Sequence, residues 1–169
     1  MKRIHIIGRK NSGKTTLIVE LVEELTARGY AVGTIKHTHH RHDFDVPGKD
    51  SHRHRTAGAC VVGLMGPDMS AVFLPTRTNG SDRDYDALLP MFADCDLLLV
   101  EGDARTSEPK IEVWRAATGT EPLAADDPAI IAVVTDDPLS SSVDVWPRSE
   151  VPTLCDRILE NTCRTLLPL

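Results

Sequence analysis

The stretch Gly8-Arg9-Lys10-Asn11-Ser12-Gly13-Lys14-Thr15, followed by Thr16, decides the fold of this chain. It fits the pattern G-x-x-x-x-G-K-[ST], a glycine-rich loop whose successive backbone N–H groups converge on phosphate oxygens. Lys14 brings positive charge to the outer phosphates, and the Thr15 hydroxyl can bind Mg²⁺. The helix expected after the loop directs its N-terminal dipole at the same anion. Gly8 to Thr16 are therefore predicted to bind the phosphates of a nucleotide.

The residues on either side of this loop favour a ligand site over a glycine-rich turn that binds nothing. The apolar run Ile4 to Ile7 precedes the loop and is typical of a buried strand. Leu17, Leu21 and Leu25 follow at helical spacing, which predicts a helix from Lys14 to about Arg28. Strand, loop and helix come in the order that the phosphate-binding motif requires.

Length, charge and cysteine content limit the classes of protein. We expect a single domain over residues 1–169, and the formal net charge of −6 argues against a nucleic-acid binder. The chain begins with a strand and has no apolar run long enough to span a bilayer, so neither a secretory signal nor a membrane segment is expected. The four cysteines form no C-x-x-C pair and are expected to be reduced, in a cytoplasmic protein.

Apolar runs and turn residues predict the other elements. The predicted strands are Ala31–Lys36, Cys60–Leu64, Met69–Leu74, Asp96–Glu101, Pro109–Trp114 and Ala129–Val134. The predicted helices are a short one from Asp50 or Ser51 to Ala57, Asp84–Phe92 and Val151–Leu166. The second and third of these strands are spaced as an antiparallel hairpin. The fold expected is a three-layer α/β P-loop NTPase fold with a mostly parallel sheet.

An acid follows the most apolar strand. Glu101 comes directly after Leu97-Leu98-Leu99-Val100, at the carboxyl edge of the sheet where ligands of open α/β sheets bind. Such an acid holds the Mg²⁺ shell or orients the attacking water in nucleotide hydrolases. The alternative is an acid that only ends a strand. Because the loop creates a need for this acid, Lys14 and Glu101 are the predicted catalytic residues.

The polar segment from His37 to Arg55 is rich in histidine. His37, His39, His40, His42, His52 and His54 suggest a metal site, but Lys36, Arg41, Lys49, Arg53 and Arg55 carry charges that oppose a bound cation. A switch segment or an anion-contacting segment at the nucleotide is the favoured interpretation. Asp45 or Asp50 is the predicted acid that joins Thr15 and Glu101 in the Mg²⁺ shell.

Taken together, these motifs resemble one family. The motifs that carry the resemblance are Gly8 to Thr16, T-I-K-H-T-H-H at Thr34 to His40, P-G-K-D-S at Pro47 to Ser51, A-G-A at Ala57 to Ala59, L-L-L-V-E-G at Leu97 to Gly102, P-K-I-E-V at Pro109 to Val113 and I-A-V-V-T-D-D-P-L at Ile131 to Leu139. The chain resembles the molybdopterin-guanine dinucleotide biosynthesis protein B family from its first strand to about Leu139. One departure is Asp103-Ala104-Arg105, where the family commonly has Phe-Lys.

The resemblance implies a P-loop GTP-binding protein, usually dimeric, with weak GTPase activity. It implies GTP and Mg²⁺ as cofactors, and an adaptor role toward the guanylyltransferase that joins GMP to molybdopterin, with molybdopterin itself a further candidate ligand. By motif matching, Thr15 and Glu101 serve Mg²⁺, and His37 to Ser51 lie at the nucleotide.

Several alternatives stay open at this point. Asp136, at the end of a late strand, is the candidate reader of guanine, with Asp137 or a helix-capping role as the alternatives. A small-molecule kinase that uses Arg53 and Arg55 is the first rival function, and a metal-delivery GTPase that uses the histidine segment is the second. No residue clearly supplies a charge-stabilising arginine in the sequence alone, so slow turnover is expected.

Overall fold

The computed structural model describes residues 2–38, 44–74 and 83–164. The chain divides into two compact units, Met1–Thr38 with Pro90–Leu169, and His39–Leu89, and each unit is described by itself. The prediction of a single domain over residues 1–169 stays a prediction. No helix in the described ranges has both the length and the apolar character needed to cross a membrane.

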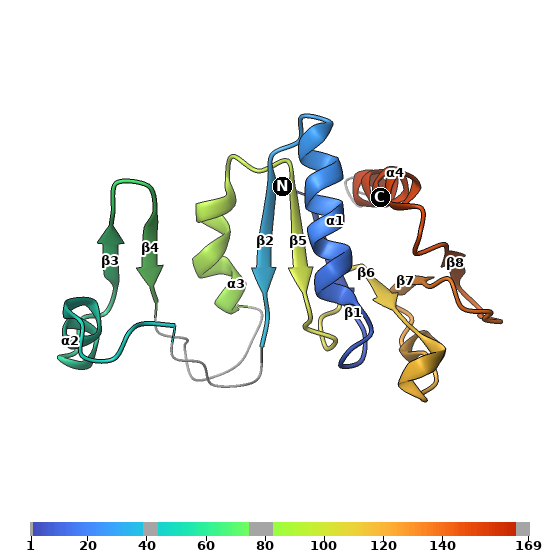
Figure 1. Ribbon diagram of the computed structural model, residues 1–169, viewed down its shortest axis with the longest axis horizontal. Coiled ribbons are helices and arrows are strands. Elements are labelled where there is room, and N and C mark those ends of the chain that lie inside the picture. The colour runs from blue at the N-terminus through green and yellow to red at the C-terminus, as the bar shows by residue number, and fades with distance from the viewer. Residues whose placement is uncertain (1, 39–43, 75–82, 165–169) are drawn as a thin grey trace. The chain divides into compact units, whose positions relative to one another are not determined.

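The larger unit is built on a parallel six-stranded sheet, shown in Figure 1. Its strands, in spatial order, are β2 (Val32–Lys36), β5 (Leu97–Glu101), β1 (Lys2–Ile7), β6 (Lys110–Val113), β7 (Ile130–Val134) and β8 (Asp144–Trp146). All their pairings are parallel. The predicted α/β fold with a mostly parallel sheet is therefore confirmed.

Strand β1 lies at the point where the strand order reverses. Its neighbour on one side is β5, which leads to β2, and its neighbour on the other side is β6, which leads to β7 and β8. Connections from the carboxyl ends of β5 and β6 consequently leave on opposite sides of β1. Ligands of open α/β sheets bind in the crevice at this position.

Both faces of the sheet are covered by apolar packing. Helices α1 (Lys14–Ala27) and α4 (Val151–Arg164) share one buried cluster with Ile4, Leu99 and Ile111. The opposite face carries Ile7 and Val133, and they pack with residues near the short 3₁₀ helices η2 (Ala116–Thr118) and η3 (Leu123–Ala125). Apolar residues on both sides of the central strands explain the uninterrupted aliphatic run of β5.

Helix α1 ends as its sequence predicts. The amide of Tyr30 donates to Leu25 O at 3.1 Å and that of Gly29 donates to Thr26 O at 2.9 Å. Gly29 has a φ of +90°, the left-handed conformation that a side chain disfavours. This is the glycine-terminated helix end that satisfies the last carbonyl groups.

The helix predicted over Asp84–Phe92 is not continuous. The structure has α3 (Arg83–Leu88), followed by the 3₁₀ helix η1 (Leu89–Phe92). Pro90 explains the change, because proline has no N–H to donate and its ring clashes with the preceding turn. Strand β8 and the 3₁₀ helices η2 and η3 were not predicted from the sequence.

The smaller unit contains a short helix and a hairpin. Helix α2 (Asp50–Thr56) precedes β3 (Val62–Met65), which pairs antiparallel with β4 (Ser70–Phe73) in a separate two-stranded sheet. The predicted hairpin is thereby confirmed. Ser51 does not cap α2: the N-cap is Lys49, and the Ser51 hydroxyl donates to Asp45 Oδ1 at 2.8 Å.

Candidate functional site

The phosphate loop is built against the end of β6. Gly8, Asn11 and Gly13 have φ values of +142°, +64° and +96°, which give the loop its tight turns. A Cβ atom on Gly8 would lie 2.3 Å from Val113 O and 2.8 Å from the Ser12 Oγ atom. Real Cβ atoms do not approach a carbonyl oxygen this closely, so the close packing of loop and strand needs glycine.

Lys14 lies across the loop. Its Nζ atom donates to Gly8 O at 2.9 Å and to Arg9 O at 2.7 Å. Burial lowers the pKa of Lys14, opposed by the Glu101 carboxylate and assisted by Lys36. Helix α1 begins at Lys14 with Gly13 as N-cap, and the first N–H groups of a helix have no carbonyl partner within it. The Lys14 ammonium and the unpaired N–H groups at the start of α1 therefore lie close together, an arrangement that suits a phosphate group.

Thr15 and Glu101 lie in direct contact on the β5 side of the loop. The Thr15 hydroxyl donates to Glu101 Oε1 at 2.8 Å, and Lys36 Nζ lies 3.4 Å from the same oxygen. The Glu101 side chain is only 14% exposed. A hydroxyl and a carboxylate side by side next to a phosphate loop are the oxygen ligands that Mg²⁺ takes in nucleotide sites. We call this the metal side of the loop, defined by Thr15, Lys36 and Glu101.

The ends of β2 and β5 also meet at the metal side. The His37 amide donates to Glu101 O at 2.8 Å, and a Cβ on Gly102 would lie 2.9 Å from His37 O. Beneath them His5, which is fully buried, lies with its Nδ1 atom 3.4 Å from Gly102 O. Burial lowers the pKa of His5, so its ring is neutral at neutral pH. The backbone that carries Glu101 is consequently held from two sides.

The opposite side of the loop is formed by the ends of β6 and β7. Asp137 Oδ2 accepts from the Ala116 amide at 2.7 Å. Asp136 Oδ1 accepts from the amide and the hydroxyl of Ser149, at 2.9 and 3.0 Å, and the Ser149 amide lowers the pKa of the Asp136 carboxyl. Asp136 thus holds the turn before α4 as an anion. We call this the β7 side, defined by Arg115, Asp136 and Asp137.

Arg115, which the sequence did not single out, lies against the phosphate loop. Its Nη2, Cζ and Nε atoms lie 3.6 to 3.7 Å from the position of a Cβ on Gly13, so the guanidinium rests on the phosphate loop. The signal in the sequence was an arginine directly after the predicted strand Pro109–Trp114. That signal places Arg115 at the phosphate loop only once this strand is known to pair with β1.

Two buried charges on β6 support the loops around the site. Lys110 is 2% exposed, and its Nζ atom donates to Ala104 O and Thr106 O at 2.8 Å and pairs with Asp127 Oδ2 at 2.6 Å. Glu112 is fully buried and accepts from the amides of Leu123 and Ala124, each at 3.0 Å. Burial raises the pKa of Glu112, and the two amides counteract that effect.

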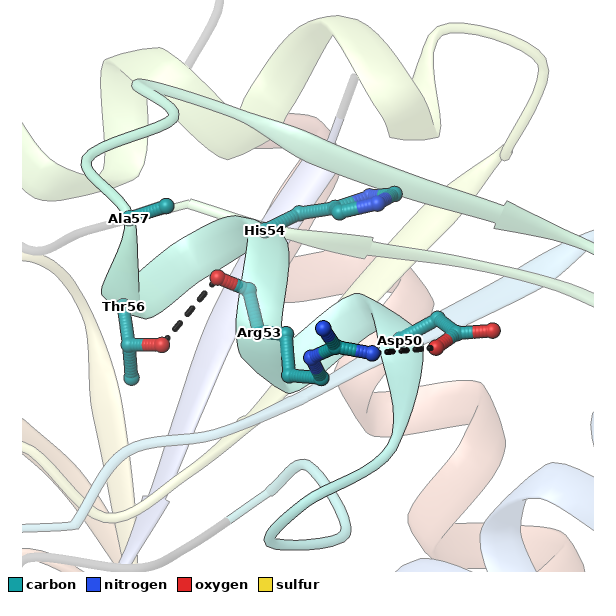
Figure 2. A pocket seen from close by; sticks show the side chains of 5 residues that line it. All are labelled: Asp50, Arg53, His54, Thr56 and Ala57. Atoms are coloured by element: carbon teal, nitrogen blue, oxygen red, sulfur yellow. Dashed lines mark hydrogen bonds and ion pairs between the residues drawn. The ribbon is translucent and has the colours of Figure 1, made fainter.

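The other predicted metal ligands lie in the smaller unit. Asp45 is 6% exposed, and its carboxylate accepts from Ser51 and lies 3.7 Å from Arg55 Nε. Figure 2 shows Asp50 at the start of α2, with its Oδ1 atom 3.6 Å from Arg53 Nη1. His54, Thr56 and Ala57 complete the pocket in that view.

The histidine segment is only partly described. His39, His40 and His42 lie outside the described residues, as does Arg41. Within the described ranges, no group of three or more His, Cys, Asp or Glu side chains could hold a metal ion. Cys60, Cys95 and Cys155 are free thiols.

Comparisons with known proteins agree on one family. A family model described as molybdopterin guanine dinucleotide synthesis protein B matches residues 3–136. The molybdopterin-guanine dinucleotide biosynthesis adapter protein of Escherichia coli (strain K12) is 36% identical over 151 residues, which cover 88% of this chain and 86% of that protein. The protein of the same name from Haemophilus influenzae is 37% identical over 153 residues, covering 90% of this chain and 85% of the relative.

Solved structures show the same fold. A crystal structure of molybdopterin-guanine biosynthesis protein B shares 25% sequence identity and superposes with a TM-score of 0.70, covering 95% of this chain and 99% of the other. The MobB protein homologue from Bacillus stearothermophilus superposes with a TM-score of 0.67 at 23% identity, covering 97% and 99% of the two chains.

Proposed function

This chain belongs to the molybdopterin guanine dinucleotide synthesis protein B family, and from that membership we propose that it is a GTP-binding adapter protein in molybdopterin guanine dinucleotide biosynthesis. The observation that carries the nucleotide part is the contact of Thr15 with Glu101 at 2.8 Å beside a phosphate loop. The relatives are named as adapters, and this supports a role exerted through a partner enzyme.

The proposed roles of the loop residues follow from their positions. The backbone of Gly8 to Thr16 binds the phosphates, and Lys14 turns its ammonium from the loop carbonyls to the outer phosphates. Thr15 and Glu101 would hold Mg²⁺, which when bound neutralises charge on the phosphates. Glu101 can also orient a water molecule, so slow hydrolysis of GTP is expected. His37, whose amide donates to Glu101 O, is the proposed contact of the terminal phosphate.

Guanine recognition is assigned to Asp136. Because Oδ1 of this carboxylate accepts from Ser149, its other oxygen is the proposed acceptor for guanine N1–H or N2–H₂. Replacement by Asn keeps an acceptor for Ser149 and turns the other oxygen into a donor. Asp136→Asn should therefore shift preference from GTP toward xanthosine triphosphate, whose base has a carbonyl in place of the amino group. An unchanged preference would leave Asp136 with only its structural contact.

The proposed partners are the guanylyltransferase that joins GMP to molybdopterin, molybdopterin itself and a second copy of this chain. Hairpin β3–β4 supports the homodimer, because among the described residues no further strand pairs with either edge of this two-stranded sheet. Its apolar side chains are unusually exposed: Met65 is 88% and Met69 is 79% exposed. Met65→Lys with Met69→Lys should shift the sedimentation of the protein toward the monomer. The proposed location is the cytoplasm, because the site needs the nucleotide pool.

The deciding experiment combines calorimetry with a reconstituted reaction. Titration with GTP and ATP in Mg²⁺ should show tighter binding of GTP, and Lys14→Ala should abolish both, because a phosphate cluster loses its main cation. Glu101→Gln should impair hydrolysis more than affinity. Wild-type protein should raise the yield of guanylylated molybdopterin at limiting GTP, and Lys14→Ala should not. Rapid phosphorylation of a small acceptor, with no effect on cofactor yield, would instead establish a kinase.

A further inference from the structure

We propose that Arg115 is a nucleotide-contacting residue that binds the α-phosphate and nucleoside half of the nucleotide on the phosphate loop. This inference rests on the proposed nucleotide binding and adds a residue that the loop motif does not include. Its starting observation is the guanidinium of Arg115, three atoms of which lie 3.6 to 3.7 Å from a Cβ position on Gly13. Nearly equal distances to Nη2, Cζ and Nε mean that the flat side of the guanidinium faces the loop.

The backbone around Arg115 is held in place by hydrogen bonds. The amide of Trp114 donates to Val134 O at 3.1 Å, and the amide of Ala116 donates to Asp137 Oδ2 at 2.7 Å. Arg115 O accepts from the amide and the hydroxyl of Thr118, at 3.0 and 2.7 Å. An exposed arginine at the end of a strand normally samples many conformations. Here its Cα is fixed relative to both β7 and the loop, which reduces the ordering cost of a contact.

The donors of the guanidinium are available to a ligand. In the described ranges, the Arg115 side chain forms no hydrogen bond or ion pair. A guanidinium has five N–H donors in a rigid plane and suits phosphate oxygens or stacking on a base. Arg28, Arg148 and Arg3, by contrast, each pair with a carboxylate. Arg115 is thus a cation at the proposed anion site that no described acid neutralises.

The two sides of the loop decide which part of the nucleotide Arg115 meets. Glu101 and Lys36 lie on the metal side, at the ends of β5 and β2. Thr15 and Glu101 would hold Mg²⁺ there, and the ion would neutralise charge on the outer phosphates, so the terminal phosphate would face the metal side. The α-phosphate and the nucleoside then leave the loop over β6 and β7, where Arg115 lies. Arg115 is therefore assigned to binding and not to stabilising charge on the transferred phosphate.

The test is the affinity of Arg115→Gln for ligands that contain different parts of the nucleotide. Gln keeps a polar side chain of similar width and removes the charge. We expect Kd for GDP and for a non-hydrolysable GTP analogue to rise by the same factor, about 10-fold to 100-fold for a lost charge-assisted contact. Pyrophosphate fills the loop without an α-phosphate or nucleoside, and it should bind wild type and variant equally.

Arg3→Gln is the matched control for net charge. Arg3 lies near the opposite end of β1 and forms a half-buried ion pair with Glu108, so this variant should bind nucleotides as wild type does. Arg115→Lys restores the charge without the planar donors and should recover part of the affinity. The melting temperature of each variant checks that the loop is intact. If Arg115→Gln fails to fold, Arg115→Lys is compared with wild type in its place. Its Kd for GDP and its Kd for the GTP analogue should then rise by the same factor.

Each outcome separates this inference from the proposed function. Absence of GTP binding by wild-type protein overturns the proposed function and the inference with it. Binding by wild type with equal affinity of Arg115→Gln overturns only the inference. A loss confined to the GTP analogue, or a slower hydrolysis rate at unchanged affinity, places Arg115 at the terminal phosphate and overturns the assignment. An equal loss in Arg3→Gln shows a general charge effect and also overturns it.

Discussion

Replacement of Gly8 by alanine should destabilise the protein through the contact between the phosphate loop and β6. The added Cβ would lie 2.3 Å from Val113 O, whereas ordinary contacts begin near 3.4 Å. The second obstacle is Ser12 Oγ at 2.8 Å, and Ser12 is only 1% exposed, so its hydroxyl has little room to move. Either the loop or the end of β6 must therefore shift.

The size of the effect follows from two contributions. A side chain at the Gly8 φ of +142° adds backbone strain of about 1–3 kcal/mol. Displacement of packed neighbours by the new methyl group adds about 1–3 kcal/mol. The sum, roughly 2–6 kcal/mol, is a large part of the 5–15 kcal/mol that stabilises a typical domain.

Urea denaturation followed by circular dichroism measures this loss, with Gly119→Ala as the matched control. Gly119 also has a positive φ, +65°, but nothing lies within 4 Å of its Cβ position. The control should lose only the left-handed strain of about 1–2 kcal/mol. Equal losses of unfolding free energy in the two variants would show that the loop does not pack against β6 as described. Because Lys14 donates to Gly8 O, Gly8→Ala should also weaken nucleotide binding, and the control should not.

Three further predictions concern buried groups of the larger unit. Lys110→Met should lower the free energy of unfolding by about 2–4 kcal/mol in urea denaturation, because it leaves Ala104 O, Thr106 O and Asp127 without their cation; a loss below 1 kcal/mol would contradict this role. Burial lowers the pKa of His5 below its usual 6.5, so the unfolded chain binds the proton more readily than the folded one. The free energy of unfolding should therefore be full above pH 6.5 and should fall as the pH decreases toward the folded pKa. In His5→Gln the unfolding free energy should depend less on pH in this range, and an equal dependence in both proteins would refute the assignment. Burial raises the thiol pKa of Cys155 to about 11, so iodoacetamide at pH 8 should label the exposed Cys60 first and Cys155 only on unfolding, and labelling of both at one rate in native protein would refute this.

Much of the larger unit could be predicted because its elements are encoded locally. The loop from Gly8 to Thr16 has its own pattern, β5 is a continuous aliphatic run, and α1 shows apolar residues at helical spacing before Gly29. The prediction of an unbroken helix across Pro90 was wrong, because proline lacks an N–H donor and its ring clashes with the preceding turn. Strand β8 spans only Asp144–Trp146, too short for an alternating pattern to be recognised.

The neighbours of the site residues could not be predicted, because they depend on the order of strands in the sheet. Thr15 and Glu101 could be expected to meet, since both have known roles at one ligand. Arg115 has no such motif, and it reaches Gly13 only because β6 lies next to β1. A pattern of residues along the chain gives no distance between segments separated by a hundred positions.

Strand β6 shows how one short segment can organise both sides of the phosphate loop. Its apolar residues Ile111 and Val113 belong to the core cluster shared by α1 and α4. Its charged residues, alternating with them, face the other side of the sheet, because side chains of a strand alternate between faces. A buried charge is costly unless it is paired, so each charge must have a specific partner in the folded protein.

Those partners are the two connections that flank the loop. Lys110 binds Ala104 O and Thr106 O, in the segment that directly follows Glu101 and the metal side. Glu112 accepts from the amides of Leu123 and Ala124, in the segment that follows Arg115 and the β7 side. The P-K-I-E-V motif therefore has a structural explanation. Its two ionic side chains hold the backbone on opposite sides of the site, and Val113 O lies so close to Gly8 that no side chain fits there. Loss of either charge should loosen one side of the loop and leave the other in place.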